Sequence, residues 1–403
     1  MNSQDYMNLE DKFGAHNYHP LPVVLEKGEG IYVWDVEGKK YFDFLSAYSA
    51  VNQGHCHPKI VEAMTEQAKK LTLTSRAFYN NVLGEYEEYI TKFFGYDKVL
   101  PMNTGAEADE TALKLARKWG YMKKGIPENK AKIICCNENF HGRTITIVSM
   151  STDPDAYSGF GPFTPGFVKI PYNDLDTLEK ELQDPNVAAF IVEPIQGEAG
   201  VYVPENGYLK NSSELCKKYN VLFIADEVQS GIARTGKMLA CDHEDVKPDI
   251  LILGKAISGG VFPVSAVLAN DDIMLCIKPG EHGSTFGGNP IAGKVAIAAL
   301  DVIKDEKLAE NAEKMGKIFR DEFNSIDSEM IQLVRGKGLL NAVIIKPKNG
   351  KTAWDVCVAM KENGLIAKPT HEHIIRFAPP LVINEKQLRE AMEIIKNTFK
   401  QFE

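Results

Sequence analysis

Four short runs of apolar residues recur along the middle of the chain, and none of them alternates with polar positions. The runs cover residues 132–136, 188–192, 221–225 and 250–253. A strand that is buried on one face alternates apolar with polar residues, whereas a strand covered on both faces is apolar throughout. The pattern therefore predicts an α/β fold, in which helices flank a mostly parallel central sheet.

Smaller elements are predicted before this sheet. Residues 1–35 are rich in turn-forming residues and predict an arm of turns. A hairpin is expected next, with strands over 31–35 and 41–45 joined by a glycine turn. Pro58 is expected to begin a helix, because apolar residues then recur on one face as far as Leu71.

The last hundred residues predict a mixture of helices and strands. A long helical stretch is expected over 298–323, a strand over 330–345, a helix over 353–361, a strand over 373–377, and a final helix with Asn384 as its N-cap. This alternation predicts a second, smaller α+β domain at the C-terminus. We expect an N-terminal segment over 1–48, a large domain over 49–305 and a small domain over 306–403.

Composition narrows the class of protein. The 403 residues include 46 Lys and Arg against 55 Asp and Glu, which gives a formal net charge of −9. An acidic chain without a basic block argues against nucleic-acid binding, and no apolar run is long enough for a membrane span. Seven scattered cysteines without a Cys-x-x-Cys pair predict reduced thiols. The acidic N-terminal residues do not resemble a signal or transit peptide, so we expect a cytoplasmic protein.

Familiar nucleotide and metal motifs are absent from the sequence. Gly336 and Gly338 are not followed by the third glycine of a dinucleotide-binding loop, and Ala256 stands where a P-loop needs Ser or Thr. His55 and His57 have no second pair of ligands at a metal-binding spacing, so no metal is expected.

Two predicted strands end in ionisable residues. Asp226 follows the apolar run 221–225, and Lys255 follows the run 250–253 and is flanked by apolar residues. The carboxyl ends of parallel strands are where α/β sheets bind ligands, and a desolvated lysine amine is a good imine-forming nucleophile. A structural salt bridge between the two residues explains the pattern equally well at this point.

Two segments could bind a phosphate group. Gly105 and Ala106 begin a predicted helix, whose first N–H groups are free to bind an anion. Ser284 and Thr285 lie in a second loop of small residues. The alternative for the first segment is an ordinary capped helix start, and the alternative for the second is a plain turn.

These segments resemble those of the class III aminotransferases, which are pyridoxal phosphate (PLP) enzymes of fold type I. The resemblance rests first on Leu253–Gly260 and Ile224–Gln229. It extends to Tyr48–Pro58, Glu193–Gly200 and Ile375–Val382, which are similar to the ornithine-using members, and it runs from about residue 14 to the C-terminus. Such an enzyme has a large domain with a mostly parallel sheet and a small α+β C-terminal domain.

The resemblance also implies cofactor-binding roles. Lys255 is expected to bind PLP covalently and to move a proton during catalysis, while Asp226 pairs with the pyridine nitrogen. The remaining expected cofactor contacts are Gln229 at the phenolic oxygen, Phe140 stacked on the ring, and Gly105, Ala106, Ser284 and Thr285 at the phosphate. The family supplies the Thr285 contact from the neighbouring subunit, which implies a homodimer with shared active sites.

The substrates implied by the resemblance are L-ornithine and 2-oxoglutarate. Arg143 and Arg376 would bind the two carboxylates of 2-oxoglutarate, because an arginine fork suits a carboxylate. Glu198 would cover Arg376 while ornithine reacts, and Tyr18 and Tyr48 would orient the α-amino and α-carboxylate groups of ornithine. A permanent structural ion pair between Glu198 and Arg376 remains an alternative.

Three further points stay open. His141 departs from the bulkier aromatic residue common in relatives, with an effect on the pocket that the sequence does not define. Another ω-aminotransferase, for acetylornithine or 4-aminobutyrate, is the alternative within the family. A non-catalytic binding subunit with the same fold is the alternative outside it.

Overall fold

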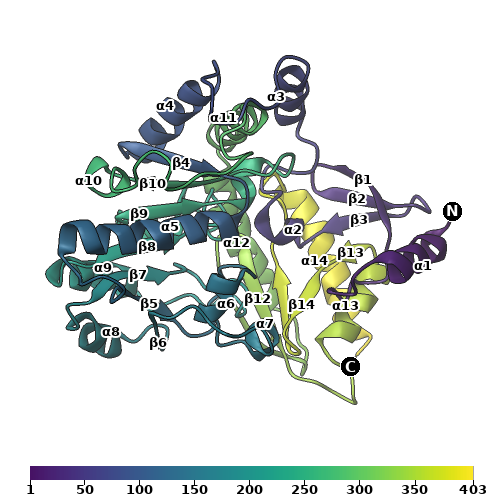
Figure 1. Ribbon diagram of the computed structural model, residues 1–403. Helices are drawn as coiled ribbons and strands as arrows, with labels where there is room; N and C mark the ends of the chain where they lie inside the picture. Colours follow the sequence, from purple (N-terminus) through teal and green to yellow (C-terminus); the bar gives the residue numbers. More distant parts are fainter. Residues whose placement is uncertain (403) are drawn as a thin grey trace.

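A seven-stranded sheet forms the centre of the computed structural model, which describes residues 1–402 (Figure 1). Its strands, in spatial order, are β4 (Lys98–Met102), β10 (Ser265–Ala269), β9 (Ile250–Leu253), β8 (Leu222–Asp226), β7 (Val187–Val192), β5 (Lys132–Cys136) and β6 (Phe167–Ile170). The five strands from β9 to β6 are parallel, and β10 runs antiparallel to both of its neighbours. The four apolar runs are therefore the strands that the sequence predicted.

Helices cover both faces of this sheet, which explains why the strands are apolar throughout. On one face, α5 (Gly105–Trp119) shares a hydrophobic cluster with Ile133 and Cys135 of β5. On the other face, α8 (Leu175–Leu182) and α9 (Tyr208–Lys218) pack with Ile134 and Cys136. The other helices of this part of the chain are α3 (Pro58–Ala68), α4 (Leu83–Phe94), α6 (Ile145–Met150), α7 (Pro154–Tyr157), α10 (Asp271–Met274) and α11 (Pro290–Asp305).

A separate four-stranded sheet follows near the C-terminus. Its order is β11 (Ile331–Lys337), β12 (Leu340–Ile345), β15 (Ile374–Phe377) and β14 (Lys368–Thr370), and the helices are α12 (Leu308–Asn324), α13 (Ala353–Glu362) and α14 (Glu385–Lys400). Four phenylalanine rings, Phe319, Phe323, Phe377 and Phe399, join α12 and α14 to the sheet. The predicted α+β character of this part is confirmed.

Two predicted elements are each divided in the structure. The helical stretch over 298–323 is two helices, because Lys307 adopts a left-handed conformation with φ of 52° between α11 and α12. The strand over 330–345 is a hairpin, because Gly338 turns the chain with φ of 55°. Left-handed backbone ends a helix or a strand whatever the apolar pattern on either side.

The prediction of a turn-rich arm was wrong for its first part. Residues Ser3–Phe13 form helix α1, although none of its residues is buried. The helix begins with a capping box, in which Asn2 and Asp5 each accept a hydrogen bond from the other's backbone N–H. Such a box satisfies two otherwise free N–H groups at the helix start.

A third sheet connects the two ends of the chain. The predicted hairpin is β2 (Tyr32–Asp35) and β3 (Lys40–Asp43), with β1 (Leu25–Glu29) at its edge. Strand β13 (Leu365–Ile366) joins β3 in parallel, so early and late segments of the chain lie side by side (Figure 1). The boundaries at residues 48 and 305 stay predictions.

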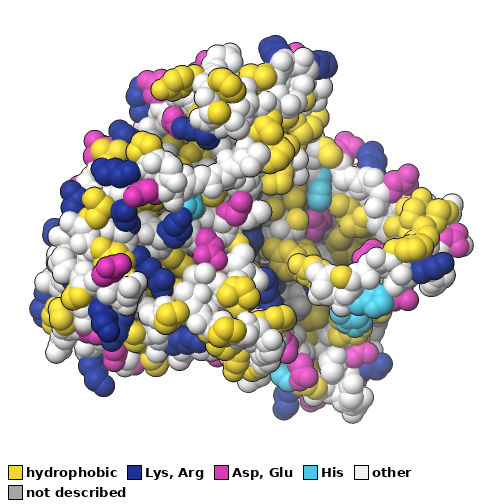
Figure 2. Space-filling view, viewed as in Figure 1, with side chains coloured by type: hydrophobic (Ala, Val, Ile, Leu, Met, Phe, Trp, Pro, Cys, Tyr) yellow, Lys and Arg dark blue, Asp and Glu magenta, His cyan; other side chains and the backbone are white. Residues whose placement is uncertain are grey.

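Charge is spread evenly over the surface that Figure 2 shows, where basic and acidic side chains are interspersed. This face therefore shows no patch of one sign that would point to a charged partner. Among residues 1–402, no helix has both the length and the apolar character that a membrane span requires.

Candidate active site

A pocket of about 160 Å³ lies where β8 and β9 end and α5 begins. Its lining residues are Gly105, Ala106, Asp109, Phe140, His141, Gly142, Glu193, Asp226, Val228, Gln229 and Lys255. Six of the residues predicted from the sequence to contact the cofactor therefore meet in one cavity: Gly105, Ala106, Phe140, Asp226, Gln229 and Lys255.

Lys255 contributes an amine to this pocket. It begins a single 3-10 turn after β9 and adopts φ of 42°, a conformation that costs a non-glycine residue about 1–3 kcal/mol. No ion pair within 4 Å involves its amine in the described part of the chain, which excludes the salt bridge with Asp226 that the sequence left open. Burial, with a smaller effect of Arg376, lowers the pKa of Lys255 despite nearby carboxylates, and so favours the nucleophilic amine.

Asp226 is held in place by His141. The Oδ2 atom of Asp226 lies 2.6 Å from Nδ1 of His141, and its Oδ1 accepts the backbone N–H of Val228 at 3.0 Å. Burial opposes protonation of His141, but the bond to Asp226 and the charges of Asp226 and Glu193 together outweigh it and raise the pKa of His141. The open question about His141 is thus answered by geometry: it supports the carboxylate of Asp226 from within the pocket.

Asp109 stands behind this pair. Its Oδ1 lies 3.8 Å from Nδ1 of His141 and has no hydrogen-bond partner among residues 1–402. Burial, reinforced by the charge of Asp226, raises the pKa of Asp109 well above its usual range. Asp109 therefore favours the neutral form.

The start of α5 forms an anion-binding end of the pocket. Thr104 caps the helix by accepting the N–H of Glu107, and Gly105 and Ala106 follow with helix N–H groups. A Cβ atom at Gly105 would lie 2.9 Å from Val228, so only glycine allows the helix to start this close to the end of β8. A flat, phosphorylated pyridine fits this donor set: N–H groups for phosphate, Asp226 for a ring nitrogen and Lys255 for an aldehyde carbon.

Phe140 presents an aromatic ring to the same cavity. Its loop is fixed by Glu193, whose Oε1 accepts the N–H of Phe140 at 2.8 Å. Glu193 also accepts the N–H of Gly197 at 3.4 Å, so one buried carboxylate holds two loops. Burial raises the pKa of Glu193 to about 7. Gly142 completes the loop with φ of 128°, and a Cβ there would lie 2.7 Å from Ala106.

A buried ion pair adjoins the pocket. Oε1 of Glu198 accepts a hydrogen bond from Nη1 of Arg376 at 2.6 Å and another from Nε2 of Gln229 at 2.9 Å. Burial alone would raise the pKa of Glu198, but Arg376 and Lys255 lower it to about 2. The buried Nε–H of Arg376 has no hydrogen-bond acceptor among residues 1–402. Gln229 is engaged by the pair while it lines the cavity.

Tyr48 reaches this pair from an unusual turn. Residues Ser46–Ser49, element α2, all have positive φ, and this left-handed turn places the Tyr48 ring centroid 4.9 Å from Cζ of Arg376. Asp43 supports the turn, because its Oδ1 accepts the N–H groups of Leu45 and Ser46. Backbone strain of this kind persists where the surrounding structure enforces it, and it concentrates at functional sites.

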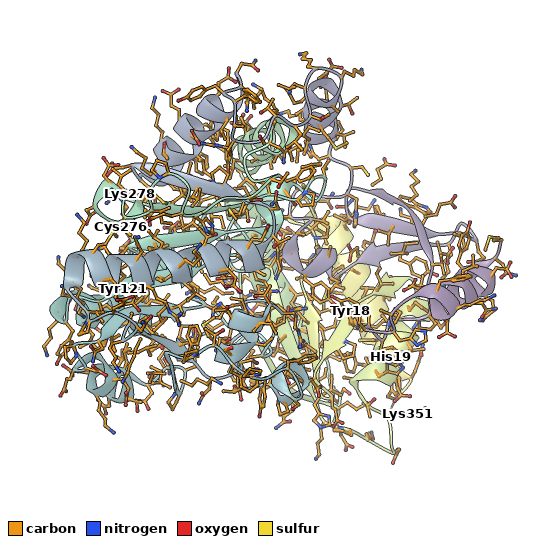
Figure 3. All side chains as sticks on the ribbon, viewed as in Figure 1. Tyr18, His19, Tyr121, Cys276, Lys278 and Lys351 are labelled. Carbon is orange, nitrogen blue, oxygen red and sulfur yellow. The ribbon has the colours of Figure 1, made fainter. Side chains whose placement is uncertain are left out.

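Four further predicted site residues belong neither to the pocket lining nor to the adjoining group of Glu198, Arg376 and Tyr48. Arg143 is exposed, with its Cζ 5.4 Å from the Phe140 ring centroid. Tyr18 is 72% exposed and lies with His19 on the arm beside the C-terminal part of the chain (Figure 3). Ser284 accepts a hydrogen bond from Asn103, and Thr285 is exposed on the same loop.

Sequence reasoning missed the supporting residues Asp109 and Glu193. Glu193 directly follows the apolar strand β7, just as Asp226 ends β8, so the rule that located Asp226 would also have located Glu193. Asp109 lies one helical turn after Gly105, and its burial has no signal in the sequence.

Known proteins share this architecture. The family model for class III aminotransferases matches residues 13–399. The mitochondrial ornithine aminotransferase of Drosophila melanogaster is 68% identical over 389 residues, which cover 96% of this chain and 90% of that protein. A Toxoplasma gondii ornithine aminotransferase structure, reported with partial PLP occupancy, aligns with a TM-score of 0.98, 52% identity and coverage of 100% and 95%.

A third relative carries a different name. The structure of an acetylornithine aminotransferase from Elizabethkingia anophelis aligns over 100% of both chains, with a TM-score of 0.92 and 64% identity. The family match and these relatives agree with the pocket's geometry. The chain belongs to the class III aminotransferase family.

Proposed function

We propose that this protein transfers the δ-amino group of L-ornithine to 2-oxoglutarate. The products are L-glutamate 5-semialdehyde, which cyclises to pyrroline-5-carboxylate, and L-glutamate. The observation that carries the proposal is the bond between Glu198 and Arg376 beside the pocket. Curated relatives at 58–68% identity over nearly the whole chain bear the name ornithine aminotransferase, which supports the same substrate.

Class III aminotransferases depend on PLP, and the pocket residues fit it. Lys255 would attach the cofactor, Asp226 would pair with its ring nitrogen, Phe140 would stack on its ring, and Gly105 and Ala106 would bind its phosphate. PLP supplies an electron sink for the electrons left when a C–H bond next to the amino nitrogen breaks.

Lys255 and Asp226 have different proposed roles in the reaction. The amine of Lys255, once released by the substrate, can take the proton from the δ-carbon and return it elsewhere, because its lowered pKa favours the basic form. Asp226, braced by His141, holds a negative charge in a buried site and so stabilises a protonated ring nitrogen. These two roles account for why both residues stand at strand ends.

The Glu198–Arg376 pair selects which end of ornithine reacts. An uncovered Arg376 would bind the α-carboxylate and bring the α-amine to Lys255. With Glu198 on Arg376, the α-carboxylate must lie farther out, near Tyr48 and Tyr18, and the δ-amine reaches Lys255. 2-Oxoglutarate then needs Arg376 for its α-carboxylate and Arg143 for its distal carboxylate, so Glu198 must leave.

N-Acetylornithine is the second candidate substrate, because a relative at 64% identity is named for it. The two substrates differ at the α-nitrogen, which is a free cation only in ornithine. Tyr48 stays a neutral hydroxyl at physiological pH, because burial raises its pKa. This hydroxyl can form a hydrogen bond to the charged α-amino group of ornithine. The acetylated nitrogen of N-acetylornithine carries no charge and does not offer the same bond.

Addition of ornithine to the PLP-loaded enzyme should therefore change the visible absorption of the cofactor, and 2-oxoglutarate should restore it. We expect kcat/KM for ornithine to exceed that for N-acetylornithine and 4-aminobutyrate by at least about tenfold, the value of one bond to a charged group. Pyrroline-5-carboxylate trapped with o-aminobenzaldehyde identifies the product. Faster reaction with N-acetylornithine would contradict the proposal.

Tyr48→Ile tests the same specificity within one chain. The variant should lose about 10- to 100-fold in kcat/KM for ornithine and gain relative activity toward 4-aminobutyrate, which lacks the α-amino group. Tyr202→Phe, which removes the hydroxyl of a more exposed tyrosine that stacks on Arg335, is the control. Unchanged ornithine kinetics in Tyr48→Ile would contradict the assignment of Tyr48.

The second part of the proposal is a homodimer with shared sites. Thr285 lies outside its own chain's pocket lining, on a loop where Phe286 is 51% exposed. Phe78 and Tyr79 are also exposed, and their loop is adjacent, because a Cβ at Gly288 would lie 3.6 Å from Arg76. Neighbouring exposed aromatic rings mark an interaction surface.

Thr285→Ala should weaken PLP binding by about 10- to 100-fold, because a bond to a charged phosphate is lost. If Thr285 acts on the partner's site, mixed dimers of Thr285→Ala with Lys255→Ala contain one intact site, and that site regains tight binding and activity. Ser158→Ala is the control for an exposed hydroxyl. A monomer in solution, or no recovery in mixed dimers, would contradict the shared site.

A further inference from the structure

Strand β14 carries a lysine that faces the Glu198–Arg376 pair. Lys368 lies directly opposite Arg376 in the antiparallel pairing of β14 with β15. Directly opposite residues project from the same face of a sheet, and so does the residue two positions along a strand. That residue is Thr370, whose hydroxyl donates to the carbonyl of Glu198 at 2.8 Å. Lys368, Thr370 and Arg376 therefore share the face that meets Glu198.

Lys368 is a cation without a carboxylate. It is half-buried, and no carboxylate oxygen lies within 4 Å of its amine in the described part of the chain. Its Nζ lies 5.9 Å from the centroid of the Tyr18 ring. Burial and the nearby Arg376 lower the pKa of Lys368, while Glu198 opposes this effect. A partly buried ammonium beside a guanidinium is unfavourable unless an anion joins it in some state of the protein.

Glu198 is a carboxylate that loses its cationic partner when a substrate binds Arg376. When 2-oxoglutarate binds Arg376, the carboxylate of Glu198 loses its hydrogen bond of 2.6 Å in a site where its side chain is only 24% exposed. Breaking a buried ion pair without replacing the partner is strongly destabilising. The bond from Thr370 holds the backbone of Glu198 against β14, so groups on this strand lie near its side chain.

We propose that Lys368 receives the carboxylate of Glu198 when a dicarboxylate substrate takes its place on Arg376. Lys368 is thus a positioning residue that acts through Glu198, and it stabilises the state of the site that accepts 2-oxoglutarate or glutamate. The inference rests on the proposed exchange of Glu198 for a substrate carboxylate.

Lys368→Met, which keeps the length of the side chain and removes the charge, tests this role. The two half-reactions are followed separately by rapid mixing. We expect the ornithine half-reaction to stay within about twofold of the wild-type value, and the 2-oxoglutarate half-reaction to need about tenfold more substrate, as for the loss of one partly buried ion pair. Binding of glutarate, a dicarboxylate that cannot react, should weaken by the same factor in calorimetry.

Three variants make the result specific. Lys346→Met, at an exposed position after β12, should change neither half-reaction, and Lys368→Arg should preserve both. In a Glu198→Ala background, Lys368→Met should have no further effect on the 2-oxoglutarate half-reaction, because the Glu198 carboxylate that Lys368 would bind is already absent.

The outcomes separate the possible roles. A tenfold loss that persists in the Glu198→Ala background would show that Lys368 binds the substrate itself, and would overturn the proposal. Equal losses in both half-reactions would show a general structural role, and would also overturn it. If Glu198→Ala leaves the preference between ornithine and glutamate unchanged, the exchange of Glu198 itself fails, and the role of Lys368 fails with it.

Discussion

Lys255→Ala is expected to reduce turnover of ornithine by at least about 10⁴-fold, the largest effect of any substitution considered for this protein. The variant loses the amine that we propose holds the cofactor and moves the proton. It should still bind PLP without covalent attachment, because Asp226 and the start of α5 are unchanged. Turnover with coupled detection of pyrroline-5-carboxylate measures the loss, and mass spectrometry after borohydride reduction measures the missing covalent link.

The control for Lys255 is Lys237→Ala, because Lys237 is an exposed lysine in the chain segment between Asp226 and Lys255. The alanine variant of Lys255 should also unfold at a temperature no lower than the wild-type apoprotein. Removing a partly buried amine without an ion-pair partner relieves a desolvation penalty. Normal turnover in Lys255→Ala would overturn the assignment of the active site.

Asp226→Asn is expected to reduce kcat by about 10²- to 10³-fold while leaving the fold intact. The amide keeps the size of the side chain but removes the charge that would keep a ring nitrogen protonated, and loss of a buried charge pair is worth about 3–5 kcal/mol. Asp245→Asn, at an exposed position, is the matched control.

A second measurement on Asp226→Asn distinguishes this electrostatic role from a packing role. In the wild type, the bond to Asp226 raises the pKa of His141 above its usual value, so the imidazole holds its proton to higher pH. In the variant, the charge of Asp226 is lost, so burial, which lowers that pKa, outweighs the smaller raising effect of Glu193. The His141 resonances in NMR should therefore titrate at lower pH in Asp226→Asn, and an unchanged titration would contradict the role of Asp226.

Much of the fold was predictable because the apolar pattern reports burial directly. The four runs became β5, β7, β8 and β9, and the hairpin and the final helix appeared where the pattern placed them. Helix α1 was not predicted, although Tyr6, Leu9 and Phe13 recur at a helical spacing, and these three apolar side chains stay exposed. The break at Lys307 was missed because left-handed backbone at a lysine has no signature in composition.

The site was predictable where chemistry coincides with the end of an apolar strand, as at Asp226 and Lys255. Burial without a strand end, as at Asp109, left no such signal. Lys368 was also missed, because its importance depends on the register between β14 and β15, and register is a property of pairing rather than of either segment. The proposed homodimer and the cytoplasmic location stay predictions.

The pairing of β3 with β13 means that a strand made early in synthesis has a partner made near the end. The turn that carries Tyr48 follows β3 directly, yet one neighbour of β3 is β13, near the end of the chain. A ribosome synthesises Tyr48 long before Ile366, so the edge of β3 that pairs with β13 stays open until the end of the chain is made. The turn that carries Tyr48 is therefore completed late, and the proposed ornithine site cannot be finished until nearly all of the chain has emerged.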